Sequence, residues 1–475
     1  MTRAPVVLVE FNELCPEMLA RFMDADALPN FRRFFESSQV YTTAAGEKPP
    51  NLEPWIQWIT VHTGLRLEGH GVFHLGDAGQ MSGDWIWDHV SRAGGSNWIC
   101  GSMNAAYGPE FRGLFLPDPW TARVAPNDAR LQPYYAFVQE QVQEHTRAKA
   151  PVRIGAAAAF ARSMAASGLS ASTVAFGLQQ LLQERIANVR WRRPALMDRM
   201  QLDLFCHYYR RLKPDFATFF SNSTAHYQHV YWRFMDPAPF TIKPTDRETR
   251  ELGGAILWGY TEMDRMLGRI VALAPEGATI VFATGLSQQP CPVYEAGGGK
   301  TFYRAIDLAK LLQFAGIDPQ SCSVEPVMSE EFFLRFARAE LAAQARERLV
   351  ALSVAGNSAF KARLEGDAVF AGCTLFTALP RDARLQGSAG SAPFFELMYG
   401  VDILKSGMHH PDGALWIREP GGRHQQYAEP VALERVAPTI LGLLGLTVPE
   451  ELPEPLPGAV AAASRPRPRV AAAVG

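Results

Sequence analysis

Residues 214–237 read PDFATFFSNSTAHYQHVYWRFMDP and join a strand-like segment to a helix-like one. The run DFATFF is apolar and rich in aromatic residues, as is typical of a buried strand. A polar cluster, SNST, follows it, and then comes a segment with two histidines one helical turn apart and an aromatic run. The same order recurs after PVVLVEF (5–11), SNWICGS (96–102) and ATIVFATGLS (278–287). Strands that alternate with amphipathic helices predict an α/β fold built on a mostly parallel sheet.

The composition is that of a soluble globular protein. The chain has 475 residues, of which 47% are hydrophobic and 20% are charged. This length is enough for a large core and for more than one domain. The net charge of −2 gives no electrostatic reason to expect nucleic acid or an anionic membrane as a partner.

The remaining global signals concern cellular location. Six cysteines are scattered without any CxxC pair, so we expect them to be reduced. The N-terminal run MTRAPVVLVEF is too short for a signal peptide, and no segment reaches the ~18–20 apolar residues that a membrane helix needs. We therefore expect a cytoplasmic protein without a membrane span.

The pattern of residues along the chain predicts four segments. Residues 1–150 and 213–452 are expected to form one discontinuous α/β domain. Residues 151–212, rich in Ala, Leu, Gln and Arg, predict a helical insertion that caps the strand ends. A second helical stretch is predicted at 329–352, and the Pro/Ala/Arg-rich tail 453–475 is expected to be disordered.

Polar residues follow three of the predicted strands. In open α/β sheets, ligands bind beyond the carboxyl ends of the strands. Glu10 and Asn12 end the first strand and share a face, because side chains alternate along a strand. We expect these two residues to be catalytic. The predicted substrate-binding residues end the other two strands and are Asn222, Thr284, Ser287 and Gln288.

Five motifs resemble the alkaline phosphatase superfamily, and in particular its type I phosphodiesterase/nucleotide pyrophosphatase branch. They occur in the family's order and span the chain apart from the insertion and the tail. The motifs are LPNFRRFFESSQVYTT (28–43), WIQWITVHTGLRLEGHGV (55–72), QHVYWRFMDP (228–237), SGMHHPDGALWI (406–417) and VAPTILGLLGLTVPEEL (436–452). The resemblance implies a three-layer alkaline-phosphatase-like domain.

The resemblance also implies two metal ions, usually zinc, and a Ser or Thr nucleophile. Several of the implied ligand positions are substituted in this chain. The first aspartate falls on Asn12, an Asp-x-x-x-His pair falls on Ala225 and His229, an Asp-His pair falls on Thr284 and Gly285, and a late histidine falls on His409. The nucleophile falls at Glu53 or Pro54, where there is no hydroxyl group.

These substitutions predict at most one metal ion, zinc or another divalent cation, and not the usual two-metal centre. His226 lies beside the vacant aspartate position, so His226, His229 and His409 are the predicted ligands, and three imidazoles can hold zinc. The alternative is that these histidines only pack and form hydrogen bonds. Glu53 is a candidate ligand, general base or nucleophile, or else a solvated loop residue.

Two functional hypotheses remain. The first is a divergent hydrolase or transferase that acts on a small-molecule or glycan-linked phosphate-type ester through a rebuilt site. The second is a catalytically inactive family member that binds a ligand or a partner. The vacated positions hold polar residues such as Glu10 and Thr284, which favours the enzyme. The sequence does not indicate the oligomeric state.

Overall fold

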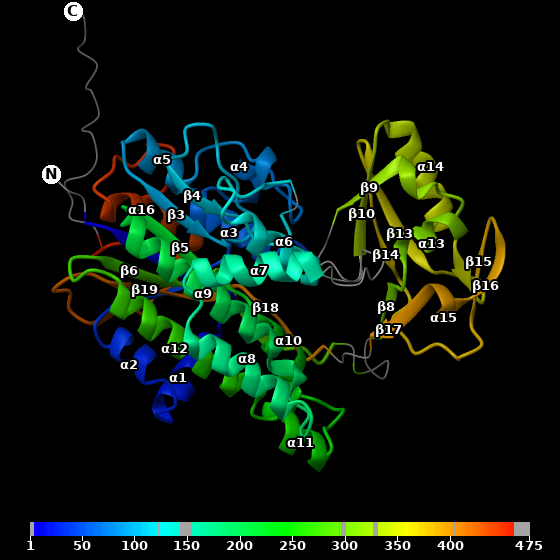
Figure 1. Cartoon of the computed structure of the whole chain (residues 1–475), viewed down its shortest axis with the longest axis horizontal. Coiled ribbons are helices and arrows are strands. Elements are labelled where there is room, and N and C mark those ends of the chain that lie inside the picture. Colours follow the sequence, from blue (N-terminus) through cyan, green and yellow to red (C-terminus); the bar gives the residue numbers. More distant parts are fainter. Residues whose placement is uncertain are drawn as a thin grey trace, which may run out of the picture.

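A nine-stranded β-sheet runs through the larger part of the molecule (Figure 1). The computed structural model describes residues 4–121, 123–142, 154–293, 295, 301–325, 331–401 and 405–459. The strand order is β20-β2-β19-β6-β1-β5-β3-β4, and β21 also pairs with β2. The strands are β1 (Val6–Phe11), β2 (Gln39–Ala44), β3 (Asn97–Cys100), β4 (Gly113–Leu116), β5 (Phe216–Ser221), β6 (Thr279–Ala283), β19 (Asp412–Arg418), β20 (Gln425–Gln426) and β21 (Val431–Ala432).

The sheet is largely parallel. β1 pairs in parallel with β5 and β6, and β3 pairs in parallel with β4 and β5. β19 runs antiparallel between β2 and β6. Glu10 of β1 is level with Phe220 of β5 and Ala283 of β6, so the three central strands end together. The predicted α/β fold with a mostly parallel central sheet is confirmed.

Helices cover both faces of the sheet, which gives three layers. Along β1, Val7 and Val9 enter one hydrophobic cluster while Val6 and Leu8 enter another, as the period of a strand requires. The first cluster includes α1 (Pro16–Asp24), α2 (Pro29–Phe35), α6 (Gln132–Val142), α9 (Arg193–Leu212), α10 (Ser223–Met235) and α12 (Ala255–Leu273). The second includes α3 (Pro54–Thr63), α5 (Ile86–Arg92) and α16 (Val436–Leu443). The short helices α4 (Leu67–His70) and α11 (Asp246–Leu252) lie in connections.

The insertion contains α7 (Ile154–Ala166), α8 (Ala171–Gln183) and α9. α9 lies along the face of the sheet, where Phe205 packs between Trp98 of β3 and Phe219 of β5. It reaches the end of β5 through Asp198, which accepts a hydrogen bond from Ser221 Oγ at 2.6 Å. α8 packs on the outer side of α9. The insertion is therefore part of a lateral helical layer, whereas the sequence predicted a cap above the strand ends.

Residues 302–401 form a separate structure, here called the β lobe, which contributes no strand to the central sheet among the described residues. It has its own hydrophobic cluster and three small sheets. Its strands are β8 (Phe302–Ala305), β9 (Cys322–Glu325), β10 (Glu331–Phe336), β11 (Ser353–Val354), β12 (Asn357–Ser358), β13 (Phe360–Glu365), β14 (Ala368–Cys373), β15 (Arg384–Gly387), β16 (Gly390–Pro393) and β17 (Met398–Val401). Its helices are α13 (Leu308–Phe314), α14 (Ala339–Val350) and α15 (Phe394–Leu397).

The predicted helix at 329–352 is wrong in its first part. Residues 331–336 form the strand β10, and only α14 is helical; residues 329 and 330 lie outside the described part. In the strand, Phe332, Leu334 and Phe336 enter the cluster of the β lobe, so membership of the cluster follows a period of two. Phe333 is buried on the other face, where it packs against His74 and Phe370. The separate β lobe was not anticipated from the sequence.

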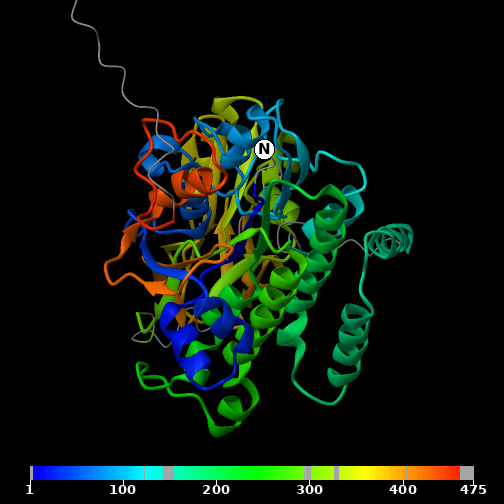
Figure 2. The same cartoon turned by 90° about the vertical axis from the view of Figure 1, so that its left-hand side faces the viewer.

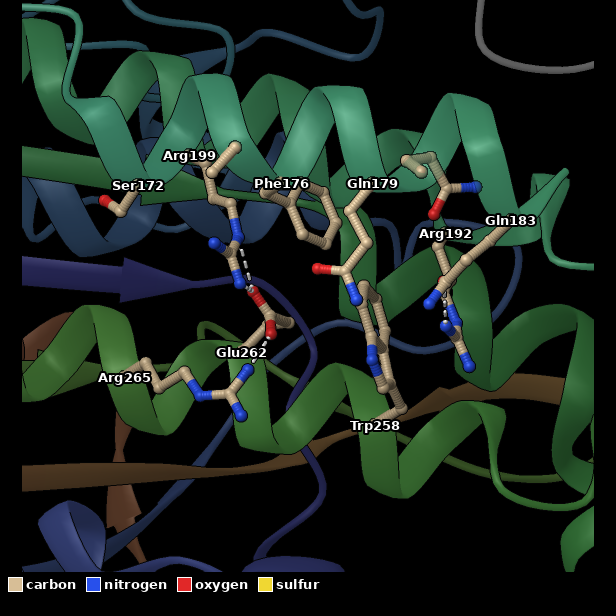
Figure 3. Close-up of a pocket in the computed structure, with 11 residues that line it drawn as sticks. Ser172, Phe176, Gln179, Gln183, Arg192, Arg199, Trp258, Glu262 and Arg265 are labelled. Atoms are coloured by element: carbon tan, nitrogen blue, oxygen red, sulfur yellow. Dashed lines mark hydrogen bonds and ion pairs between the residues drawn. The ribbon is translucent and has the colours of Figure 1, made fainter.

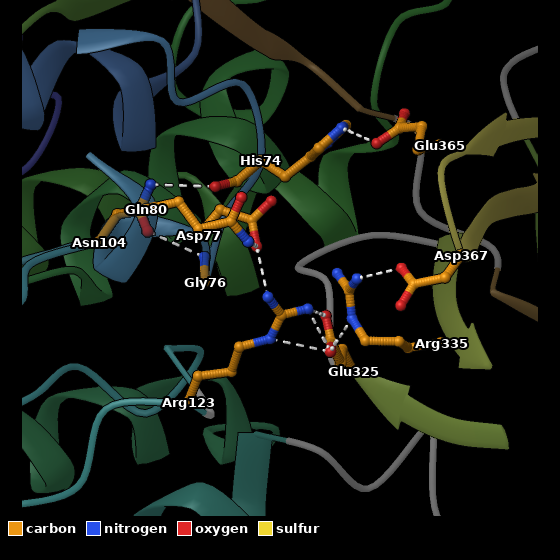
Figure 4. Close-up of polar contacts among 10 residues, drawn as sticks. All are labelled: His74, Gly76, Asp77, Gln80, Asn104, Arg123, Glu325, Arg335, Glu365 and Asp367. Atoms are coloured by element: carbon orange, nitrogen blue, oxygen red, sulfur yellow. Dashed lines mark hydrogen bonds and ion pairs between the residues drawn. The ribbon is translucent and has the colours of Figure 1, made fainter. Parts of the chain in front are cut away.

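Charged side chains join the β lobe to the α/β domain (Figure 4). Arg123 binds Asp77 at 3.3 Å in its own domain and Glu325 of the β lobe through both carboxylate oxygens. On the side of the lobe, Arg335 binds Glu325 at 3.1 Å. His74 pairs with Glu365 at 2.6 Å. Each arm of this network is partly exposed, so any single pair contributes only modestly to stability.

The prediction of a disordered tail from residue 453 is wrong for residues 453–459, which pack against the α/β domain. Leu456 is 1% exposed, and Ala459 is also buried. The Arg435 side chain donates hydrogen bonds to the backbone oxygens of Glu454 and Pro455, each at 2.8 Å. Residues 460–475 lie outside the described part of the chain. No helix within the described residues combines the length and the apolar character needed to cross a membrane.

We predict that Leu8→Ala destabilises the α/β domain. Leu8 is fully buried at the centre of the sheet, and removing such a side chain costs about 2–5 kcal/mol of unfolding free energy because a cavity is left behind. The control is Leu364→Ala in β13, where the side chain is 42% exposed and the expected change is within ~0.5 kcal/mol. Urea unfolding followed by tryptophan fluorescence measures both. Equal effects of the two substitutions would contradict the packing described here.

Candidate functional site

Asn12 is the centre of a buried hydrogen-bond network just past the end of β1. Its side-chain N–H groups donate to Glu13 Oε1 and to Asn222 Oδ1, both at 2.8 Å. Its Oδ1 accepts from the indole N–H of Trp58 at 2.7 Å. Asn222 follows β5 directly and Trp58 lies on α3, so the network joins two strand ends to a helix. The three donor and acceptor partners leave the Asn12 amide well satisfied.

Glu13 is held in a left-handed backbone conformation, with φ of 62°. Such a conformation is uncommon for a residue with a side chain and persists only where the surroundings impose it. Here the Glu13 N–H donates to the Thr284 carbonyl at 3.1 Å, and the Glu13 carbonyl accepts from Gln228 Nε2 at 2.7 Å. Tyr260 in turn donates to Gln228 Oε1 at 2.6 Å. These bonds turn the Glu13 carboxylate toward the space beyond the strand ends.

Two histidines meet the Glu13 carboxylate. His229 lies on α10, and His409 lies on β18 (Gly407–His410), which pairs with β7 (Ser287–Pro290). Glu13 Oε2 is 3.0 Å from His229 Nε2 and 3.6 Å from His409 Nε2. The two imidazole rings meet edge to face at an interplanar angle of 75°, with centroids 5.2 Å apart. Gln288 of β7 donates to the same Glu13 oxygen from its side-chain amide.

The tautomer of His229 is set by its second nitrogen. Nδ1 lies 3.0 Å from the carbonyl oxygen of Gly407, which can only accept, so this nitrogen carries a proton. A neutral imidazole in this form directs the lone pair of Nε2 at Glu13 Oε2. Two lone pairs at hydrogen-bond distance repel, so either a proton or a metal ion must lie between these atoms.

The protonation states of the buried partners suit a cation. Burial opposes ionisation of Glu13, but His409, His229 and the hydrogen bond from Gln288 outweigh it and lower the pKa of Glu13 to about 2. Burial lowers the pKa of His409 to about 4, against the opposing effect of Glu13. At neutral pH Glu13 is therefore a carboxylate and His409 is neutral, which are the forms that bind metal ions.

Glu13, His229 and His409 together can hold a metal ion. One ligand atom from each lies within 4.8 Å of the others. Among the described residues, no other group of three or more His, Cys, Asp or Glu side chains is arranged in this way. Two imidazoles and one carboxylate form the ligand set of several catalytic zinc sites and of non-haem iron sites. The bond from His229 Nδ1 to Gly407 provides the outer contact that fixes a metal-binding imidazole. The residues present therefore fit a single divalent cation.

Glu53 lies at the edge of this group, directly before α3. Its Oε2 is 3.5 Å from His409 Nδ1, and its side chain is partly exposed. Burial raises the pKa of Glu53 to about 8; Lys405 opposes this effect, while Glu13 and Glu331 add to it. Glu331 belongs to β10, so the β lobe contributes to the electrostatics of the site. Glu53 is thus a carboxyl group that can carry a proton near neutral pH.

The structure places Glu10 away from this group. Glu10 is fully buried, and its Oε1 lies 2.8 Å from His62 Nε2 on α3. Glu10 and Asn12 both face α3, as expected from alternation, but Glu10 is one pleat deeper inside the core. The Glu10 side chain is therefore not positioned to meet a substrate, and the catalytic role predicted for it is not supported by its location.

His226 does not join the other two histidines. It is exposed on α10 and is not a member of the group formed by Glu13, His229 and His409. Residues three positions apart on a helix point about 60° away from each other, so His226 and His229 need not converge. The three-histidine arrangement predicted from the sequence is replaced by two histidines and Glu13.

The predicted substrate-binding residues have intramolecular partners. Thr284 Oγ1 is buried and accepts from the Ala414 N–H at 2.8 Å. Gln288 is buried and donates to Glu13 and, at 3.0 Å, to the Ala225 carbonyl. Ser287 is buried in β7, and the side-chain oxygen of Asn222 accepts a hydrogen bond from Asn12. Gln288 thus positions the candidate metal ligand, while substrate binding by these four residues stays a prediction.

Glu13 is the candidate metal ligand that sequence reasoning missed. It follows Asn12 immediately, and the alternation of side chains along a strand would direct it to the face opposite Asn12. The left-handed turn at Glu13 breaks this alternation. The available signal was a second acidic residue, in EFNELCP (10–16), at a strand end.

No family model matches the sequence, and no curated protein does. Solved structures of ectonucleotide pyrophosphatase/phosphodiesterase 5 are similar to this chain. The murine protein has a TM-score of 0.42 and 8% identity, and the human protein has 0.42 and 9%, each over 95% of this chain and 96% of that one. An inactive variant of the murine protein in complex with AMP has a TM-score of 0.40 and 11% identity. These proteins carry the name of the branch that the motifs resemble; at this similarity they carry no information about activity.

Gly407→Ala should disturb the candidate site. A Cβ at position 407 would lie 2.5 Å from the Gln228 carbonyl oxygen, so β18 and His409 must shift. Such overpacking costs about 1–3 kcal/mol of unfolding free energy. Gly254→Ala is the control, because no atom lies within 4 Å of a Cβ there. Thermal unfolding of both variants measures the difference, and a neutral Gly407→Ala would show that the approach of β18 is looser than described.

Glu53 should make stability depend on pH. Its pKa is about 8 in the folded protein and near the ordinary 4.5 when unfolded, so between these values the folded state binds more protons. Stability therefore falls as the pH rises through this window. Measured in chelator, the wild type should lose stability relative to Glu53→Gln from pH 4.5 to pH 8. A difference that stays constant with pH would contradict the raised pKa.

Proposed function

We propose that this protein is a hydrolase or transferase acting on phosphate-type esters, with one divalent cation held by Glu13, His229 and His409. The observation that carries the proposal is the convergence of Glu13 Oε2 with His229 Nε2 at 3.0 Å and with His409 Nε2 at 3.6 Å, while His229 Nδ1 is already bonded to the Gly407 carbonyl. Zinc is the first candidate, because two histidines and a glutamate form a known catalytic zinc set.

A second metal ion has no place in this proposal. The position where the resembled family has its first aspartate is Asn12, whose amide is bonded to Trp58, Glu13 and Asn222. A Cβ on Gly285 would lie 3.1 Å from the Trp58 ring, so the indole occupies the space beside that residue. Neutral amide and indole groups do not compensate the dehydration of a dication. The site is therefore a one-metal variant of the centre implied by the resemblance.

When bound, the cation would polarise a phosphoryl oxygen or lower the pKa of a water molecule. The residues of this chain supply the rest of the chemistry. Glu53 lies 3.5 Å from His409 Nδ1 and can give a proton to a leaving oxygen or take one from an attacking hydroxyl. Residues 53 and 54 are Glu and Pro and offer no hydroxyl. Because Glu53 acts as the acid or base in this proposal, the attacking group is a water molecule or a hydroxyl of an acceptor substrate. Lys405 lies near enough to Glu53 to affect its charge and adds a cation for a phosphate group.

The alternative function is that of an inactive family member that binds a ligand or a partner. One observation favours it: a proton on His229 Nε2 can be donated to Glu13 Oε2 at 3.0 Å, and Gln288 donates to the same oxygen. In this alternative a proton on His229 takes the place of the metal. The two functions differ in metal content and in turnover.

We predict that the purified protein binds one equivalent of a divalent cation. Glu13→Gln and His229→Ala should each weaken binding by more than about 100-fold, beyond the cost of losing an outer contact. His226→Ala on the same helix is the matched control and should bind as the wild type does. Elemental analysis gives the stoichiometry, and titration with zinc after chelation gives the affinity.

Activity tests complete the experiment. The wild type with metal should hydrolyse an aryl phosphate monoester or diester, or transfer its phosphoryl group to an alcohol, and Glu53→Gln should keep the metal but lose rate. Metal binding without turnover on these substrates would favour the binding function. Absence of metal from the wild type, together with unchanged behaviour of Glu13→Gln, would exclude the proposed enzyme.

A further inference from the structure

Helices α8, α9 and α12 enclose a groove of about 410 Å³ (Figure 3). Its outer wall is α8, which lies with α7 along one side of the molecule (Figure 2). None of the residues that line the groove belongs to the candidate metal site. Each helix presents one face to it, because the lining residues recur at helical spacing. Those of α8 include Phe176, Gln179 and Gln183, and those of α12 are Trp258, Glu262 and Arg265.

Four planar side chains form a row along the groove. The guanidinium group of Arg199 stacks on Phe176, 4.0 Å from the ring centre. Phe176 and Trp258 are nearly parallel, with an interplanar angle of 24° and centroids 6.2 Å apart. The guanidinium group of Arg192 lies 5.4 Å from the ring centre of Trp258. Figure 3 shows Arg199 toward one end of the groove, Arg192 toward the other, and the two aromatic rings between them.

The spacing of the two terminal arginines is set by α9. Arg192 directly precedes this helix with helical backbone angles, and Arg199 follows seven residues later. Seven residues make almost two turns, so both side chains leave the same face of the helix about 10 Å apart along its axis. The groove thus has two cationic ends at a fixed separation and an aromatic middle.

The groove carries an excess of positive charge. Three arginines line it, and Glu262 is the one acidic residue among the lining residues. Arg199 and Arg265 share the Glu262 carboxylate, so this end keeps one net positive charge. At the other end, Arg192 donates to the neutral side chain of Gln183 at 3.1 Å, and no described carboxylate forms an ion pair with it. Guanidinium groups without an anionic partner attract oxyanions, which accept their forked hydrogen bonds.

We propose that the groove binds a small organic dianion, with one oxyanion at each arginine end and a flat apolar body against Phe176 and Trp258. The two net positive charges match two negative charges on the ligand. The arginines are already held in place by their contacts with aromatic rings and with Gln183 or Glu262. Binding therefore requires little further ordering of these side chains.

The dimensions of the groove favour a small molecule over a protein partner. A volume of about 410 Å³ lies within the ~300–1,000 Å³ typical of small-molecule sites. A stable protein interface would instead need about 800 Å² of surface on each partner. The amide side chains of Gln179 and Gln183 along α8 offer further hydrogen bonds to a polar ligand.

The test is isothermal titration calorimetry of the full chain with the biphenyl dicarboxylate that carries one para carboxylate on each ring. This probe has two oxyanions at opposite ends of a flat apolar body. The comparison ligands are biphenyl monocarboxylate, which lacks one oxyanion, and terephthalate, which is one ring shorter. We expect the dicarboxylate to bind about tenfold more tightly than either. Chelator is present throughout, so that no carboxylate binds to a metal ion at the candidate metal site.

Two variants each remove the cation from one end of the groove. Arg192→Gln and Arg265→Gln should weaken binding of the dicarboxylate by about tenfold and abolish its advantage over the monocarboxylate. A purely structural role of these arginines would not change this selectivity. The matched control is Arg190→Gln, because Arg190 is close to Arg192 in sequence, has a 77% exposed side chain and does not line the groove. Thermal unfolding of the free proteins shows whether each variant is folded.

Several outcomes would overturn the proposal. Equal affinity for the three ligands would remove the requirement for two oxyanions, and no binding of any of them would leave the arginines a role in packing only. Binding that survives Arg192→Gln but is lost in His229→Ala would place the ligand at the candidate metal site. Tighter binding of an oligoglutamate peptide than of the dicarboxylate would assign the groove to a protein partner. None of these measurements depends on metal binding or turnover.

Discussion

The ionised carboxylate of Glu13, buried between two imidazoles, is the interaction on which the site depends. A charge in such a place is expensive unless it is paired and hydrogen-bonded. Glu13 Oε2 meets His229 at 3.0 Å and accepts from Gln288. To present that oxygen, the backbone adopts a left-handed turn, and Gln228 and Thr284 hold the turn from both sides. Strand ends, helix α10 and the pair of strands β7 and β18 therefore converge on one carboxylate.

Beside this charged group lies a neutral one, and the contrast explains the chemistry that we propose. Asn12, Trp58 and Asn222 satisfy one another through direct bonds of 2.7–2.8 Å. Neutral partners of this kind fill space and fix geometry, but they supply no negative charge. One half of the strand-end region can thus hold a cation, while the other half serves as packing.

The sequence allowed the fold and part of the site to be predicted. Apolar strands such as VVLVEF and the polar residues after them indicated a parallel sheet with a site at the strand ends, since both follow from local pattern. His229 and His409 were found through the motifs around them. Glu13 was not, because its orientation depends on a backbone turn that long-range bonds to Gln228 and Thr284 impose. Glu10 was misplaced for a different reason: alternation gives the face of a strand to which a side chain points, but not its depth in the core. The β lobe was missed because EFFLRF resembles the start of a helix until its partner strands are known.

The pairing of β7 with β18 has a mechanical consequence. The chain leaves the α/β domain after β7 and returns at β18, so these two strands form the stem from which the β lobe is hung. One strand of the stem carries Gln288 and the other carries His409, and each touches Glu13 from its own side. A displacement of the β lobe would therefore shift Gln288 and His409 together, and with them two contacts of the Glu13 carboxylate at the candidate metal site.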